Sequence, residues 1–159
     1  MEPVYEVLSH ILCDSPGSNA SSKDPRFSHQ HQLKSLASTA QRPDLLGATA
    51  EEKALIQQWI ELAVTQLAAS SDARGMTEEL DSFLSTRGFL VGHRLTLADL
   101  VLFAATHAHF SALTFQEKER VPNASRWFAH VQNCVRQMGR DSSMAEVTFI
   151  RNKLYQLCL

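Results

Sequence analysis

The chain has 159 residues, of which 44% are hydrophobic and 20% are charged, which suffices for a single domain with a buried core. Its formal net charge of -2 gives no overall positive field of the kind that holds nucleic acid. The longest apolar stretch, residues 97–105, is far shorter than the roughly 20 residues of a membrane span, and the N-terminus lacks the basic start and apolar core of a secretory signal. We therefore expect an intracellular protein.

The N-terminal region, residues 1–47, is predicted to be a reduced and divergent segment with little structure of its own. Residues 14–28 are rich in Ser, Asp, Pro and Gly, and this composition predicts a loop. Leu33 and Leu36 recur at helical spacing and indicate a short amphipathic helix that ends before Pro43. The segment from Pro43 to Gly47 is predicted to be a linker, and before the loop the residues Val4, Val7, Leu8 and Ile11 recur at helical spacing, with a short strand at Val4 as the alternative.

The second region, residues 48–159, has the periodicity of amphipathic helices. Thr49 and Glu52 form a capping box, in which the hydroxyl and the carboxylate accept hydrogen bonds from each other's backbone N–H groups at the start of a helix. A wide apolar stripe follows, and the small and polar residues at 69–75 are predicted to end this helix. A short second helix is predicted over residues 77–88, whose final glycine suits a left-handed helix terminus.

Thr96 and Asp99 form another capping pair, before a helix predicted from Leu97 to about Phe110. This helix is apolar nearly all round, which is typical of the central helix of a bundle. A further helix is predicted to begin at or just after Pro122, and a last one is predicted to be capped by residues 143–146. Because no strand-like alternation appears in this region, the sequence predicts an all-α bundle.

The pattern Gly92-x-x-Leu95-Thr96-x-Ala98-Asp99 resembles the C-terminal helical domain of the glutathione transferase family. Trp127, shortly after a proline, also lies where this family places its next helix. The resemblance covers about residues 45–157. It implies a helical bundle of the glutathione transferase C-terminal type, a structural role for the Thr–Asp cap, and a shortened N-terminal segment whose origin in a thioredoxin-like domain stays open.

A larger set of ordered strings is similar to a branch of this family, the auxiliary scaffold proteins of the multi-aminoacyl-tRNA synthetase complex. The strings lie at residues 46–54, 57–59, 64–66, 116–119, 123–128 and 149–155. This resemblance implies a non-catalytic subunit that docks on the transferase-like domains of methionyl-tRNA synthetase and glutamyl-prolyl-tRNA synthetase. It also implies a cytoplasmic protein, with the nucleus as a further location.

Arg126 is the first candidate for partner binding. It precedes Trp127 on the predicted helix, so an inward-facing Trp127 turns Arg126 about 100° away, toward solvent or a partner. The planar guanidinium of arginine stacks and forms forked hydrogen bonds, which suits an interface; the alternative is an ion pair with a local carboxylate. Asn123 and His130, three and four residues away, share this face and complete the predicted patch.

A second interface is predicted where the helix around Leu33 and Leu36 meets the outer face of the helix that begins after Thr49. Apolar residues at these positions would also be expected if they only cover the core of the bundle. Both interpretations, a partner interface and a cover for the core, stay open.

Two other functions are alternatives to a scaffold. A glutathione transferase enzyme needs a thioredoxin-like domain to hold the thiolate, and only Tyr5, Ser9 and Cys13 are early donor candidates, so we predict no catalysis and no cofactor. Auxiliary tRNA binding through the basic residues from Lys118 onward is the other alternative. The aromatic residues there follow core spacing rather than the spacing of a stacking platform, so no direct nucleic-acid binding is predicted.

Metal binding is not predicted. The cysteines Cys13, Cys134 and Cys158 are odd in number and contain no Cys-x-x-Cys pair, which argues against a disulfide framework and a zinc site. His107 and His109 lie about 200° apart on one helix and cannot share a metal ion.

Overall fold

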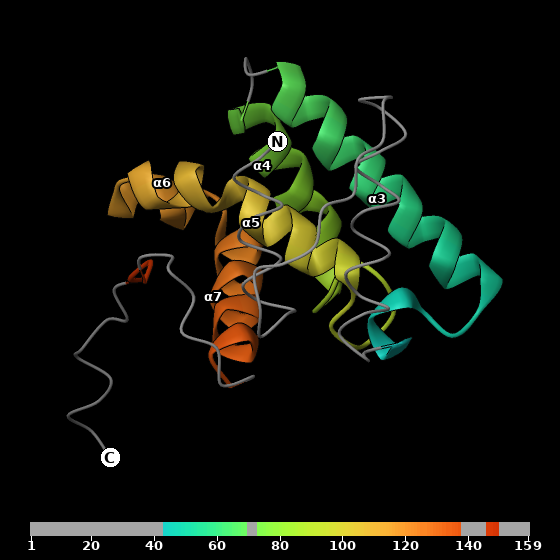
Figure 1. Cartoon of the computed structure of the whole chain (residues 1–159). Helices are drawn as coiled ribbons and strands as arrows, with labels where there is room; N and C mark the ends of the chain where they lie inside the picture. Colours follow the sequence, from blue (N-terminus) through green and yellow to red (C-terminus); the bar gives the residue numbers. More distant parts are fainter. Residues whose placement is uncertain (1–42, 70–72, 138–145, 150–159) are drawn as a thin grey trace, which may run out of the picture.

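The computed structural model describes residues 43–69, 73–137 and 146–149 (Figure 1). Within these ranges it has no β-strand, and the all-α prediction of a transferase-type C-terminal bundle is confirmed. The predicted loop at 14–28, the helix or strand predicted before it, and the positions of Leu33 and Leu36 lie outside the described residues. The elements are η1 (Pro43–Leu46), α3 (Ala50–Ala69), α4 (Ala73–Phe83), η2 (Leu84–Thr86), α5 (Leu97–Ala112), α6 (Phe115–Arg120) and α7 (Pro122–Gln137).

Helix α5 is the centre of the bundle, as its uniformly apolar sequence predicts. Helices α3 and α7 pack against it, and α4 packs against α3 and α7 (Figure 1). The core between α5 and α7 is aromatic: the Phe128 ring lies 4.5 Å from Phe110 and 4.6 Å from Phe103, centroid to centroid. All three phenylalanines are buried, and this packing fixes the position of α7. No helix of the described residues has the length and apolar character that a membrane span requires.

The capping box predicted at the start of α3 is present. The Glu52 N–H donates to Thr49 Oγ1 at 3.1 Å, and Glu52 Oε2 accepts from the backbone N–H groups of Ala48 at 2.7 Å and Thr49 at 3.5 Å. Arg94 also pairs with this oxygen at 2.8 Å. The hydrogen bond from the Ala48 N–H lowers the pKa of Glu52, and the positive charge of Arg94 lowers it further by a smaller amount. Gly47 makes the tight approach possible, with a φ of 83° that other residues rarely adopt.

Asp99 is fully buried and joins three parts of the chain. Its Oδ2 accepts from the Thr96 N–H at 2.9 Å and from the Thr96 hydroxyl at 2.8 Å, which forms the predicted cap of α5. Its Oδ1 accepts from the Leu90 N–H at 3.0 Å and from Trp127 Nε1 at 2.9 Å. Burial raises the pKa of Asp99, and these donors act against that rise. The side chain therefore ties α5 both to the preceding loop and to α7.

The second helix differs from its prediction at both ends. Helix α4 begins at Ala73 rather than at Thr77, so Gly75 lies inside a helix instead of ending one. Met76 and Leu80 of α4 are buried, and this burial offsets the cost of about 1 kcal/mol that a glycine brings to a helix. At the other end Arg87 closes η2 in an extended conformation, and Gly88 does not adopt the left-handed conformation that we predicted.

Residues 146–149 are not helical, so the last predicted helix does not run through Val147 and Phe149. The side-chain amide of Gln132 takes the place of a backbone partner for Val147: it accepts from the Val147 N–H at 3.1 Å and donates to the Val147 carbonyl at 3.3 Å. These hydrogen bonds use the groups that a helix would need. The remainder of that prediction lies outside the described residues.

Two short helices were not predicted. Residues 43–46, expected to be a linker, form η1, and Leu45 is buried in the core. Helix α6 begins with its own capping box, because Thr114 and Glu117 satisfy each other's backbone N–H groups. The boundary at residue 47 between two regions stays a prediction.

Candidate docking surface on helix α7

Helix α7 is capped by a side chain from another helix. Asp81 of α4 accepts through Oδ1 from the backbone N–H groups of Asn123 at 2.7 Å and Ala124 at 2.9 Å. Its Oδ2 accepts from the Asn123 side-chain amide at 3.1 Å. Pro122 begins the helix, where the absence of an N–H carries no cost. Asn123 is therefore half-buried against α4, and its place in a partner-binding patch stays a prediction.

Arg126 lies on the exposed side of α7, while the neighbouring Trp127 is buried, as the helical spacing predicts. No carboxylate holds its guanidinium within the described part of the chain. Instead, Nη2 donates to the carbonyl oxygens of Leu84 at 3.1 Å and Arg87 at 3.4 Å. Leu84 is the first residue of η2 and Arg87 is its C-cap, so the guanidinium lies against this single helical turn. The contacts use one nitrogen and hold the guanidinium in place, so Nη1 and the planar face can still serve a partner.

His130 and Phe89 continue the same surface. His130 is exposed one turn after Arg126, and its ring centroid lies 5.1 Å from that of Phe89. Arg87 is exposed as well, and its guanidinium lies 4.6 Å from the centroid of the Phe83 ring. We call the four residues Arg87, Phe89, Arg126 and His130 the α7 surface. Two arginines beside an aromatic ring favour a partner that presents carboxylates next to apolar side chains.

Helical spacing correctly placed Arg126 and His130 on an exposed face of α7, and their role in partner binding stays a prediction; the residues that contact them were not predicted. Asp81 lies 42 residues before Asn123, and nothing local in the sequence links the two. Arg87 was predicted to lie within the helix over residues 77–88 and Phe89 directly after it, and neither was predicted to contact a partner. The motif at Thr96 and Asp99 signalled the cap correctly, but the bond from Trp127 to Asp99 crosses 28 residues and is visible only in the fold.

The described residues contain no cluster of three or more His, Cys, Asp or Glu side chains that could hold a metal ion. His107 packs its ring against Phe103, at a centroid distance of 5.9 Å. Cys134 is partly buried, and burial raises the pKa of its thiol, which disfavours the reactive thiolate.

A central apolar helix, a buried Thr–Asp cap and a Trp-anchored outer helix define a bundle of the glutathione transferase C-terminal type. The profile of the family described as nuclear-export cofactor Arc1p matches residues 52–135. Eukaryotic translation elongation factor 1 epsilon-1 of Mus musculus is 40% identical over 125 residues, which cover 76% of this chain and 69% of the mouse protein. The chain therefore belongs to the Arc1p family, together with the epsilon-1 elongation factor subunit.

Two further relatives have names that refer to tRNA aminoacylation. The tRNA-aminoacylation cofactor arc1 of Schizosaccharomyces pombe is 32% identical over 110 residues, which cover 69% of this chain and 24% of the yeast protein. A bifunctional glutamate/proline–tRNA ligase of Cricetulus griseus is 29% identical over 117 residues, which cover 72% of this chain and 8% of the ligase. A segment similar to this bundle thus occurs inside a synthetase.

Proposed function

We propose that this protein is a non-catalytic scaffold subunit that assembles aminoacyl-tRNA synthetases by docking on their transferase-like domains. The observation that carries the proposal is the occurrence of a similar segment in both a tRNA-aminoacylation cofactor and a glutamate/proline–tRNA ligase. We assign methionyl-tRNA synthetase and glutamyl-prolyl-tRNA synthetase as the partners. The family description as a nuclear-export cofactor supports action in the cytoplasm with access to the nucleus.

The α7 surface is the proposed contact. Arg126 is exposed yet held by two backbone carbonyls, so little side-chain entropy is lost when a partner binds it. Its charge stays available because carbonyls, rather than a carboxylate, hold Nη2. A partner carboxylate pairs with Nη1, and apolar partner groups pack on the guanidinium face and on Phe89. His130 adds a hydrogen-bonding ring at the edge of this contact.

The test is direct binding of the purified protein to purified transferase-like domains of the two synthetases, measured by isothermal titration calorimetry. Arg126→Ala is expected to weaken binding to one of them by tenfold or more, since truncation of a central interface arginine costs about 2 kcal/mol or more. Arg136→Ala is the matched control, because Arg136 lies on the same helix but pairs with Glu146. It should bind as the unaltered protein does.

Arg126→Lys separates charge from shape: it keeps the charge but loses the planar group, and it should bind nearly as weakly as the alanine variant. Added glutathione should leave binding unchanged. Failure of both synthetase domains to bind would refute the scaffold role. Unchanged binding by Arg126→Ala would refute only the placement of the contact.

A further inference from the structure

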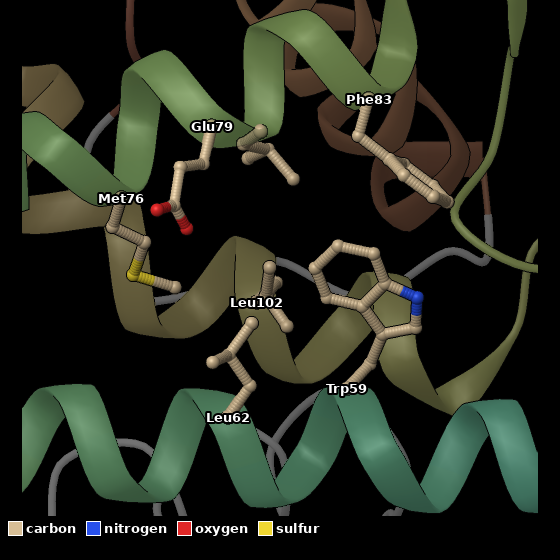
Figure 2. A pocket seen from close by; sticks show the side chains of 7 residues that line it. Trp59, Leu62, Met76, Glu79, Phe83 and Leu102 are labelled. Carbon is tan, nitrogen blue, oxygen red and sulfur yellow. The ribbon is translucent and has the colours of Figure 1, made fainter.

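A cavity of about 200 Å³ opens between α3, α4 and α5, on the side of α4 that faces α3 (Figure 2). Leu102 of α5 is fully buried at its floor, and Met76 of α4 is buried in its wall. The half-buried side chains of Trp59, Leu62 and Phe83 and the exposed Glu79 stand at its opening. The cavity is therefore an apolar pocket with a single carboxylate at its opening.

The carboxylate of Glu79 points into the space between α4 and the other two helices, beside the thioether of Met76 (Figure 2). Glu79 forms no ion pair with any residue that the structure describes. The adjacent Glu78, in contrast, pairs with Arg74 at 3.3 Å on the helix surface. A carboxylate without an ion-pair partner at the opening of an apolar pocket attracts a cation, and the apolar walls leave fewer groups to compete for it.

The aromatic side of the pocket also favours a cation. The rings of Trp59 and Phe83 meet edge to face, with centroids 4.8 Å apart and an interplanar angle of 68°, which holds both rings in place. The Arg87 guanidinium already lies 4.6 Å from the Phe83 centroid, so its charge opposes a second cation at that ring. The favourable position is therefore between the Trp59 indole and the Glu79 carboxylate.

We propose that this pocket, lined by Trp59, Met76, Glu79 and Phe83, binds an arginine side chain of a partner protein. The aliphatic stem of the arginine fills the apolar interior, and the guanidinium stacks on Trp59 while it pairs with Glu79. Lysine fits less well, because its ammonium is compact, strongly hydrated and unable to stack. The site lies on the α3 side of α4 and shares no lining residue with the α7 surface, although Arg87 of that surface contacts Phe83. The proposal does not depend on the proposed synthetase contact.

The experiment is an NMR titration of the full chain with a short alanine peptide that carries one central arginine. The chain has two tryptophans, so the indole signal of Trp59 reports the pocket, and that of the buried Trp127 serves as an internal reference. Matched peptides with citrulline, which keeps the shape without the charge, and with norleucine, which is only apolar, test the chemistry. We expect the arginine peptide to shift the Trp59 signal and to bind about tenfold more tightly than either matched peptide.

Glu79→Gln removes the charge and keeps the shape, and it should weaken binding of the arginine peptide about tenfold. Glu78→Gln is the neighbouring control and should change binding by less than about twofold. Equal binding of the norleucine peptide would overturn the proposal in favour of an apolar occupant. Unchanged binding by Glu79→Gln, or no shift of Trp59 with the arginine peptide, would also overturn it. Thermal unfolding of both variants checks that the fold is intact. We expect no change in Tm, because Glu78 and Glu79 are both exposed.

Discussion

Replacement of Asp99 by alanine should destabilise the bundle far more than the loss of a helix cap. A cap alone contributes about 0.5–2 kcal/mol. In this fold the same carboxylate also accepts from the Leu90 N–H and from Trp127 Nε1, and all of these groups are buried. Asp99→Ala leaves three N–H donors without an acceptor, two on the backbone and one on the indole. At about 1–3 kcal/mol for each buried unsatisfied group, less what relaxation recovers, we expect a loss of about 3–5 kcal/mol.

The assay is urea unfolding followed by circular dichroism, which gives the free energy of unfolding and its dependence on urea. Glu117→Ala is the matched control, because Glu117 closes the same kind of capping box at α6 but is exposed. Its loss should be clearly smaller. Asp99→Asn should fall between the two, since one amide oxygen can still accept from Leu90 and Trp127 while the amide nitrogen faces the Thr96 N–H. A loss for Asp99→Ala no larger than that for Glu117→Ala would refute the bridging role.

Three further outcomes are expected. Trp127→Phe removes one donor to Asp99 and should cost about 1–2 kcal/mol of unfolding free energy in the same urea assay; a loss below about 0.5 kcal/mol would contradict this. Glu52→Gln should lower the free energy of unfolding relative to the unaltered protein, and this difference should be at its full size above pH 4.5, the usual glutamate pKa. The difference should disappear as the pH falls through the lower pKa of Glu52 in the folded protein; a difference independent of pH would count against the cap. Gly47→Ala should cost about 1–2 kcal/mol by thermal unfolding, because its φ is 83° and the added Cβ would lie 2.9 Å from the Glu52 Cβ; an unchanged Tm would contradict this.

The sequence predicted those parts of the fold that depend on local signals. Capping boxes at Thr49–Glu52 and Thr96–Asp99 act over four residues, and together with the apolar period they predicted α3 and α5 nearly at their observed bounds. Pro122 correctly predicted where α7 begins. The box of Thr114 and Glu117 was equally local, so α6 could have been found from the same signal. The prediction of a left-handed helix end at Gly88 was wrong. It rested on the general preference for glycine at helix ends, whereas η2 ends in an extended conformation that any residue adopts.

The exposed face of α7 was predictable only in part. Helical spacing placed Arg126 and His130 outside and Trp127 inside. What holds Arg126 was not visible, because the carbonyls of Leu84 and Arg87 reach it only when α4 and α7 pack together. A long-range contact between a side chain and a backbone carbonyl leaves no pattern in a single sequence.

The capping of α7 by Asp81 has a consequence for the order of folding. Helices α3, α5 and α6 carry their capping groups within their own sequences, so each can begin before the others are in place. The cap of helix α7 is Asp81 of α4, so the first N–H groups of α7 have this acceptor only after the two helices pack together. Mutations at Asp81 should therefore show low φ-values in folding kinetics, and a peptide of α7 alone should be less helical than one of α3. Helix α7, which carries the proposed contact, is therefore expected to form only after α4 is in place.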